Sequence, residues 1–177
     1  GEARTEANYT TKYDGGKYAE MLLQGDSHSY NATIFYPEET RRFNIYDPAF
    51  NKDDPTFKPL RSKSKNGKYA LTFGCSADKL ASTLGVPSRK AKQLYESFWD
   101  NNPALKELKL AVERYYDSAG KSKGMPAIDG RLLVTRSKHS LLNLLFQSAL
   151  AIVMDMACCF LDGWLGGLHI DEKGRPY

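Results

Sequence analysis

The sequence predicts a mainly α-helical fold with one small β-hairpin. Apolar residues recur at helical spacing along most of the chain, which favours packed amphipathic helices. Asp129-Gly130 is typical of a tight hairpin turn, and Leu132 and Val134 alternate after it as in a strand. The segment 138–165 is long and apolar enough to form one extended helix. A chain of 177 residues can bury a core of this kind.

The same patterns divide the chain into five consecutive segments. The first segment is 1–32, in which residues 1–25 are expected to begin in an extended conformation and to run into a helix that Gly25 ends. Prolines and aromatic residues in 33–60 predict an ordered but irregular insertion. The remaining segments are a group of helices over 61–126, a hairpin with the long helix over 127–165, and a polar tail over 166–177.

Short-range signals set the boundaries of the middle helices. A basic helix over 61–74 precedes a short helix from Ser76 to Leu84, which a glycine ends. Asn102-Pro103 ends a further helix and starts the next one, because proline suits the first helical turn. The buried stripe of that last helix is predicted to be Leu105, Leu108, Val112 and Tyr115.

Positive charge is concentrated in one part of the chain. The formal net charge is only +4, but residues 52–92 contain ten Lys or Arg against three Asp or Glu. A local basic block in a nearly neutral chain fits a polyanionic partner such as phosphate groups, and it also fits an ordinary solvated face. Charge alone leaves both interpretations open.

The three cysteines lead us to expect a reducing, cytoplasmic environment. An odd count, with Cys158 and Cys159 adjacent, suits neither a disulfide framework nor a zinc site. Both cysteines lie in an apolar stretch and are predicted to be in the core. No signal peptide is recognised. Polar residues within 141–165 would lie deep in a bilayer, so a buried helix of a soluble protein is expected there.

Four residues spaced by four form the candidate binding surface: Arg61, Lys65, Tyr69 and Phe73. On an α-helix they share one broad face in the order cation, cation, aromatic, aromatic. Arginine and lysine can bind a triphosphate, and a flat aromatic ring can pack against a sugar or base. An amphipathic helix with two core aromatics would show the same spacing. Gly67 costs this helix roughly 1 kcal/mol relative to alanine, which indicates either a special local requirement or lower helical quality.

The pattern Arg-x3-Lys-x3-Tyr-x3-Phe-Gly resembles the O helix of family A DNA polymerases. Gly25-Asp26-Ser27-His28 resembles the segment that precedes that helix, and Glu2-Ala3-Arg4 resembles the end of a motif that begins with a metal-binding aspartate. Further matches follow in the order of the family: Leu80 to Gly85, Ala91 to Trp99, Pro103-Ala104-Leu105, Asp129-Gly130-Arg131, and Arg136-Ser137-x-His139-x3-Asn143-x3-Gln147-Ser148.

This resemblance implies the fingers subdomain and part of the palm of a right-hand polymerase fold. It places 1–32 between palm and fingers, 61–126 in the fingers, and 127–165 in the palm. The short spacing from Asp129 to Gln147 is similar to that of phage replicative enzymes.

The resemblance also implies roles in binding the incoming dNTP. Arg61, Lys65 and His28 would bind triphosphate oxygens, and Tyr69 would pack against the sugar and base. In the family, a tyrosine at that position implies tolerance of nucleotides that lack the 3′-hydroxyl. Glu2 would lie under the sugar and disfavour ribonucleotides.

Phe73 completes the residues expected to bind dNTP, and four further residues would contact the primer-template DNA. Phe73 matches an aromatic residue, usually tyrosine, that stacks near the template base, and phenylalanine lacks the hydroxyl of that residue. The last motif resembles the palm helix that reads the minor groove, through groups common to all sequences. Its candidate DNA contacts are Arg136, His139, Asn143 and Gln147.

Polymerase chemistry of this kind uses two Mg²⁺ ions held by two carboxylates. The resemblance places one aspartate before Gly1 and the other in a His-Asp-Glu motif beyond the long helix. His169-Ile170-Asp171-Glu172 has an extra residue between His and Asp, and it is interpreted as loop. We therefore expect no metal ligand and no catalytic residue here, and weak binding of nucleotide or DNA without polymerisation. The parent enzyme, or this chain with complementing fragments, is expected to polymerise.

Three other functions fit parts of the pattern. A non-catalytic nucleic-acid-binding module, or an accessory polymerase subunit, would use the basic helix for DNA backbone only. A single-subunit phage RNA polymerase has a related helix, but Glu2 and the minor-groove helix argue against it. Ser62-x-x-Lys65 and Ser76-x-x-Lys79 fit a serine acyl-enzyme pattern, yet no companion motif accompanies them.

Overall fold

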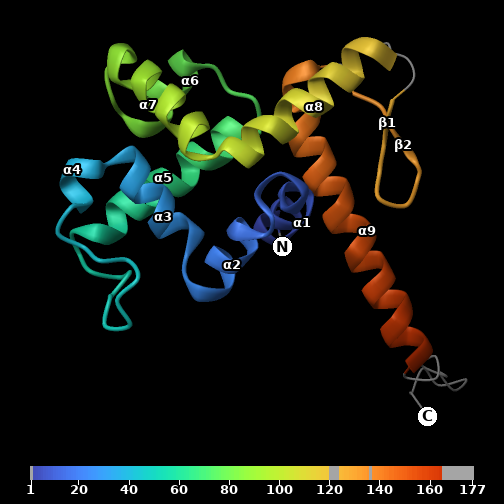
Figure 1. Ribbon diagram of the computed structural model, residues 1–177, viewed down its shortest axis with the longest axis horizontal. Coiled ribbons are helices and arrows are strands. Elements are labelled where there is room, and N and C mark those ends of the chain that lie inside the picture. Colours follow the sequence, from blue (N-terminus) through green and yellow to red (C-terminus); the bar gives the residue numbers. More distant parts are fainter. Residues whose placement is uncertain (1, 120–123, 136, 165–177) are drawn as a thin grey trace, which may run out of the picture.

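A computed structural model describes residues 2–119, 124–135 and 137–164. These residues are mainly helical, with one two-stranded antiparallel sheet, so the predicted fold class is confirmed (Figure 1). In chain order the elements are α1 (Glu2–Asp14), α2 (Lys17–Gln24), α3 (Ser27–Phe35), α4 (Pro37–Thr40), α5 (Phe57–Thr72), α6 (Ala77–Leu84), α7 (Ser88–Asn101), α8 (Pro103–Ala119), β1 (Met125–Pro126), β2 (Leu132–Leu133), the 3-10 helix η1 (Lys138–Ser140) and α9 (Leu141–Trp164).

Helices α3, α5, α6 and α7 pack into one group around a shared apolar core. Phe35 of α3 stacks on Phe98 of α7 with ring centroids 5.7 Å apart. A Cβ atom at Gly67 would lie 2.9 Å from Leu84 Cδ2 and 3.4 Å from the Phe35 ring. The special requirement suggested by Gly67 is therefore close packing of α5 against its neighbours.

The insertion before α5 is ordered around a cluster of aromatic rings. Phe43 and Phe50 both pack edge-on against Phe57, with centroids 5.0 and 4.9 Å away. Asp54 Oδ1 accepts hydrogen bonds from the backbone N–H groups of Thr56 and Phe57, which starts the helix. Helix α5 consequently begins four residues earlier than the predicted residue 61.

The expected extended start of the chain is wrong, because residues 2–14 form helix α1. The buried residues of α1 are Glu6, Ala7 and Thr10, which are polar or small. A helix whose inward side lacks large apolar residues shows no hydrophobic periodicity in its sequence. Helix α1 packs against α2 on one side and against α8 and the first half of the long helix α9 on the other (Figure 1).

The predicted boundaries around α6 and α8 are confirmed. Ser76 Oγ accepts a hydrogen bond from Lys79 N, and Gly85 ends α6 with φ +67°. One detail of the buried stripe of α8 is wrong. Tyr116 is 8% exposed, whereas Tyr115 is 42% exposed, because the buried side of the helix turns by one residue at this end.

The hairpin turns at Asp129-Gly130 as predicted, and Gly130 has φ +85°. Its strands pair Met125 with Leu133 and Pro126 with Leu132, so the first strand starts before residue 127. After the hairpin, the backbone of η1 passes close to the end of α5. A Cβ at Gly74, which has φ +80°, would lie only 2.1 Å from the carbonyl oxygen of His139. Glycine at this position therefore allows the end of α5 to lie against the start of the long helix.

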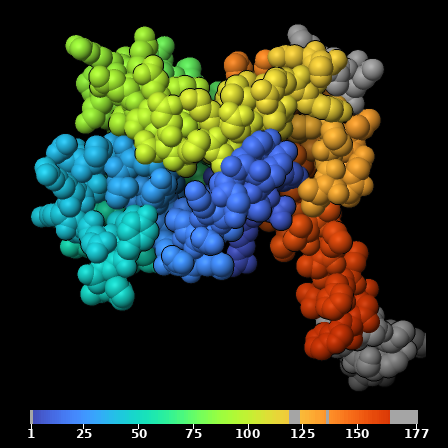
Figure 2. Space-filling model, in the orientation of Figure 1, coloured from blue at the N-terminus to red at the C-terminus, as the bar shows by residue number. Residues whose placement is uncertain are grey.

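Helix α9 is buried in its first half only. Residues up to Ile152 pack against the molecule, whereas every residue from Val153 to Trp164 is exposed. This second half extends away from the body in Figures 1 and 2. The predictions of a buried helix and of core positions for Cys158 and Cys159 are therefore wrong for this structure. The cause is that packing against α1 and α8 covers only the first half.

The segment Lys138–Trp164 also passes a test of length and composition for a helix able to cross a membrane. Its most apolar window of 18 residues has a mean hydropathy of 2.0, and 22% of that window is buried. The test uses length and composition only, so a single helix that passes it is weak evidence for a membrane span.

Candidate nucleotide-binding site

Four residues spaced by four share a surface that we call the outer face: Arg61, Lys65 and Tyr69 of α5, and Phe73, which directly follows the last residue of α5. The ammonium of Lys65 lies 5.9 Å from the centroid of the Tyr69 ring. The Tyr69 and Phe73 rings are stacked, with centroids 6.1 Å apart and an interplanar angle of 28°. Phe73 is 46% exposed, so it is not the core residue of an ordinary amphipathic helix.

His28 reaches the outer face from the first turn of α3. Its ring packs edge-on to Tyr69 at 6.0 Å, and its Nδ1 is buried with no hydrogen-bond partner among the described residues. Burial lowers the pKa of His28 to about 4, with Asp26 opposing this shift and the nearby cations Lys68, Arg61 and Lys65 adding to it. His28 is therefore neutral near pH 7 and close to the aromatic end of the outer face.

Arg61 is held by Asp26, a contact that sequence reasoning missed. Its Nε and Nη2 donate to the two carboxylate oxygens at 2.6 and 3.0 Å, which makes a bidentate pair. Asp26 also accepts hydrogen bonds from the backbone N–H and hydroxyl of Ser29 and so caps α3. Partial burial raises the pKa of Asp26, but the bonds from Arg61 and Ser29 lower it well below its usual range. The pair fixes α3, and with it His28, against the start of α5.

Next to the outer face, on the buried side of α5, lies a second unpredicted feature, the buried triad of Lys68, Glu6 and Tyr18. The Lys68 ammonium lies 2.8 Å from Glu6 Oε2 and donates to the Tyr18 hydroxyl at 2.6 Å. Glu2, one turn before Glu6, is near enough for both charges to affect it. Burial and the Glu6 charge raise the pKa of Glu2, and Lys68 opposes them. Glu2 is thus on the triad side of α5.

The predicted DNA contacts lie along the start of the long helix. His139 is in η1, and Asn143 and Gln147 follow at intervals of four, so the three occupy one side of the continuous segment. Gln147 is exposed, and Asn143 Oδ1 is buried without a partner in the described chain. Arg136 lies outside the described residues, as does the segment 169–172.

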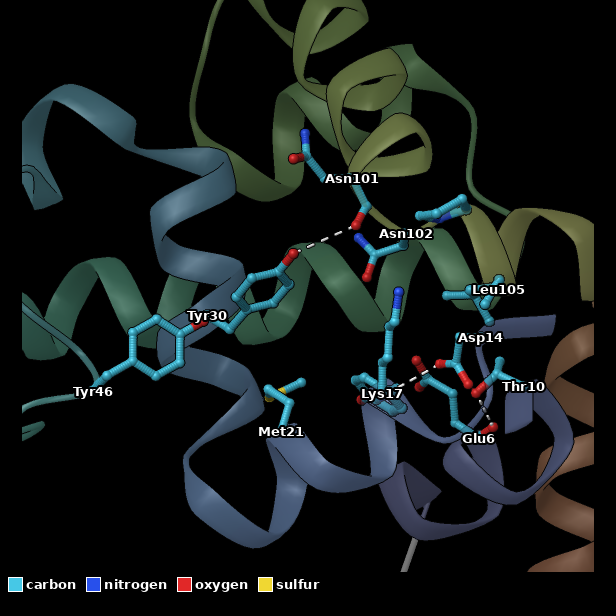
Figure 3. Close-up of a pocket in the computed structure, with 13 residues that line it drawn as sticks. Glu6, Thr10, Asp14, Lys17, Met21, Tyr30, Tyr46, Asn101, Asn102 and Leu105 are labelled. Carbon is cyan, nitrogen blue, oxygen red and sulfur yellow. Dashed lines mark hydrogen bonds between the residues drawn. The ribbon is translucent and has the colours of Figure 1, made fainter. Parts of the chain in front are cut away.

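A cavity of about 320 Å³ opens between α1, α2, α3 and the corner joining α7 to α8 (Figure 3). Its walls include Tyr30, Tyr46 and Leu105, and Glu6 and Tyr18 of the triad lie at one side. None of the residues predicted to bind dNTP or DNA lines it. We assign the candidate site to the outer face because cations and stacked rings converge there, as a nucleotide requires.

The described residues do not fit a magnesium centre. No three side chains of His, Cys, Asp or Glu among them come together as a set able to hold a metal ion.

The fold is that of part of a Pol I-type polymerase domain. The chain superimposes on the POL domain of Pol1 from M. smegmatis, solved in complex with DNA primer-template and dNTP, with a TM-score of 0.60. The match has 19% sequence identity and covers 84% of this chain and 25% of that one.

In sequence, the chain is a distant relative of family A DNA polymerases of phages. It is 24% identical over 163 residues to the DNA-directed DNA polymerase of Escherichia phage T7 and, equally, to that of Enterobacteria phage T3, and these matches span 86% of the chain. It is 26% identical over 155 residues to the DNA-directed DNA polymerase of Escherichia phage Phieco32. The chain spans about one fifth of the length of these relatives, at 20 to 21%. No protein-family model matches it.

Proposed function

We propose that this chain is the nucleotide-gripping part of a template-directed DNA polymerase and that the outer face of α5 binds the triphosphate, sugar and base of the incoming dNTP. The observation that carries this proposal is the convergence of Lys65, Tyr69, Phe73 and His28 from two helices onto one accessible surface. The sequence relationship to DNA-directed DNA polymerases supports it.

The chemistry of the outer face suits a nucleotide from one end to the other. Lys65 supplies a mobile cation for phosphate oxygens. Arg61 is paired with Asp26, which offsets its charge, and would bind the triphosphate through the N–H groups that Asp26 does not accept. Tyr69 and Phe73 supply flat apolar surfaces for sugar and base. His28 donates to an anion when its ring is oriented or protonated for that bond.

Primer-template DNA is the second proposed partner, through His139, Asn143 and Gln147 at the start of the long helix. The close contact between Gly74 and the His139 backbone joins this segment to the end of α5. A nucleotide on the outer face and a DNA end on the long helix would therefore meet at the Phe73 end of α5.

The rest of a polymerase is the third proposed partner. Large apolar side chains are exposed along one broad side of α9 after Ile152, including Met156, Phe160 and Trp164, and Asp155 and Asp162 lie on the other side. An exposed apolar face of this kind is suited to packing against other protein elements. We propose that this half-helix packs into the remaining polymerase domain, supplied by the same parent chain or by a complementing fragment. We propose that the remaining polymerase domain also holds the Mg²⁺ ions. We propose a cytoplasmic location for the enzyme, which is the host cytoplasm if the enzyme is viral.

A comparison of two lysines on α5 tests the nucleotide site. Lys65→Ala should weaken dNTP binding by about tenfold or more, because a charge-assisted contact to phosphate is lost. Lys63→Ala removes the same charge from an exposed position that is not on the outer face and should change the dissociation constant little. Isothermal titration with dNTP measures both variants.

Equal dNTP affinities for the two variants would contradict the proposed site. A loss of DNA affinity that is the same for every sequence, with no measurable dNTP binding by any form, would instead favour the non-catalytic nucleic-acid-binding module. Primer extension tests activity. We expect none from the 177-residue chain alone, and robust metal-dependent synthesis by it would overturn that expectation.

A further inference from the structure

Lys68 occupies an unusual place for a lysine, inside the protein on the inner face of α5. Only 4% of the residue is exposed, and its neighbours along this face are Ser64, Gly67 and Leu71, all buried. Lysine is almost never buried to this extent unless it is paired. Lys68 is paired on two sides, since its ammonium contacts Glu6 of α1 and Tyr18 of α2.

The triad therefore joins three helices through one charged atom. The Lys68 ammonium also lies 4.9 Å from the centroid of the Tyr18 ring. Burial alone lowers the pKa of Lys68, but the Glu6 carboxylate and the Tyr18 hydroxyl raise it above its usual value. Burial and Glu6 raise the pKa of Tyr18 to about 12, with Lys68 opposing them. Lys68 stays charged and Tyr18 stays neutral at neutral pH, so the contacts persist.

Stability alone does not account for such a pair. Two buried charges lose their hydration, and replacing a buried ion pair by packed apolar residues is often neutral or stabilising. A hydrogen-bonded ion pair depends on geometry more strongly than apolar packing does, because it requires one separation and one orientation of the two groups. The triad thus defines how α5 is rotated about its axis relative to α1.

That rotation matters for the outer face because Lys68 directly precedes Tyr69. On α1, Glu6 follows Glu2 by one helical turn, and the Glu6 carboxylate contributes to the raised pKa of Glu2 across that turn. Tyr69, which is proposed to pack against the sugar, is therefore next to the Lys68 end of the ion pair. Glu2, which the family resemblance places under the sugar, is next to the Glu6 end. Figure 3 shows Glu6 in α1, beside the cavity that separates α1 from α3.

We propose that Lys68 is a positioning residue: its contacts with Glu6 and Tyr18 hold the outer face of α5 at a fixed distance and rotation relative to Glu2. The inference rests on the proposed function for its consequence, which is the choice between deoxyribose and ribose. A change in the pair should alter this choice without touching the nucleotide directly.

The test replaces the pair by apolar residues in the double variant K68M/E6L. A matched control, K58M/D53L, removes an exposed ion pair from the start of the same helix. We expect both double variants to fold with melting temperatures near that of the unaltered protein. K68M/E6L should nevertheless bind dNTP at least about fivefold more weakly and lose a similar factor of preference for dNTP over rNTP, because small displacements weaken oriented contacts. The control should keep both values.

A second measurement records the helix positions without any nucleotide. Spin labels at the exposed residues Asn8 of α1 and Asn66 of α5, in a cysteine-free background, give the distribution of distances between the two helices. K68M/E6L should broaden or shift this distribution, and K58M/D53L should not. Tyr18→Phe, which removes one hydroxyl, should cause a smaller change of the distance distribution in the same direction. This variant replaces the double variant in the test if the double variant does not fold.

An unchanged distance distribution in K68M/E6L or, if it does not fold, in Tyr18→Phe would overturn the positioning role of Lys68. A changed distribution with unaltered sugar preference would overturn its proposed consequence. If the unaltered protein binds neither nucleotide, the proposed function fails, and the distances still decide whether Lys68 positions α5.

Discussion

Two lysines of α5, three residues apart, differ in their exposure to solvent: Lys65 is exposed and Lys68 is buried. Lys65 is exposed on the outer face and lies over the Tyr69 ring, whereas Lys68 is buried on the inner face between Glu6 and Tyr18. We propose that the same side-chain chemistry serves two tasks, which are phosphate binding by the outer lysine and positioning of the helix by the inner lysine. One helix therefore contains both the candidate grip and its support.

The two lysines should differ most in how much each contributes to the free energy of unfolding. Lys68→Met would leave the Glu6 carboxylate buried without its partner, which should lower the free energy of unfolding by about 3–5 kcal/mol. Lys65→Met changes an exposed position and should stay within about 0.5 kcal/mol. Urea denaturation of the two variants measures this contrast. Equal losses would mean that the inner and outer faces of α5 are not distinguished as the structure indicates.

A smaller effect is expected from side-chain volume on the two faces. Gly67→Val places new atoms against Leu84 and Phe35 and should destabilise the protein by about 1–3 kcal/mol. Asn66→Val adds the same β-branched side chain at an exposed neighbour and should cost less than about 1 kcal/mol. Thermal unfolding of both variants checks the difference. A Gly67→Val protein as stable as Asn66→Val would argue against close packing of the inner face.

The outer face was predictable from sequence, and the inner face was not. Arg61, Lys65, Tyr69 and Phe73 follow one helical period, and local signals such as Ser76 and Gly85 mark the next helix. Lys68 was missed because a lysine normally indicates a solvent-facing position. Its place in line with Ser64 and Leu71 was the signal that could have revealed it. The partners of Lys68 are 50 or more residues away, and no local pattern connects them.

Burial was also predicted wrongly where it depends on neighbours rather than on the residue itself. Helix α1 buries Glu6 and Thr10, whose polarity suggested no packed face. The second half of α9 is apolar, yet it is exposed because the elements described here pack only on its first half. Composition reports what a helix can bury, and the surrounding fold decides what it does bury.

The smallest predicted effect is a pH dependence that belongs to the outer face. Because the pKa of His28 is lowered to about 4 from 6.5, the unfolded chain binds this proton first as pH falls. The His28 contribution to stability is therefore present above pH 6.5 and is lost progressively between pH 6.5 and 4. His28→Asn should flatten the melting-temperature profile in this window, as seen by thermal scans at several pH values.

Binding of a triphosphate should act on His28 in the opposite direction. The added negative charge favours the protonated ring and should raise the pKa of His28 from its value of about 4 in the nucleotide-free protein. Binding of dNTP should therefore take up protons, and the contribution of His28 to affinity should increase as pH falls towards 4. His28→Asn should remove that part of the dependence. Identical pH profiles for the two proteins would place the triphosphate away from His28.

Mapping of the bound nucleotide by NMR tests the central claim most directly. Addition of dNTP to the isotope-labelled protein should shift the signals of His28, Lys65, Tyr69 and Phe73, while the inner-face signals of Gly67 and Leu71 change little. Shifts confined to the cavity beside Tyr18 and Tyr30, or no shifts at millimolar dNTP, would contradict the assignment of the outer face of α5 as the nucleotide-binding surface.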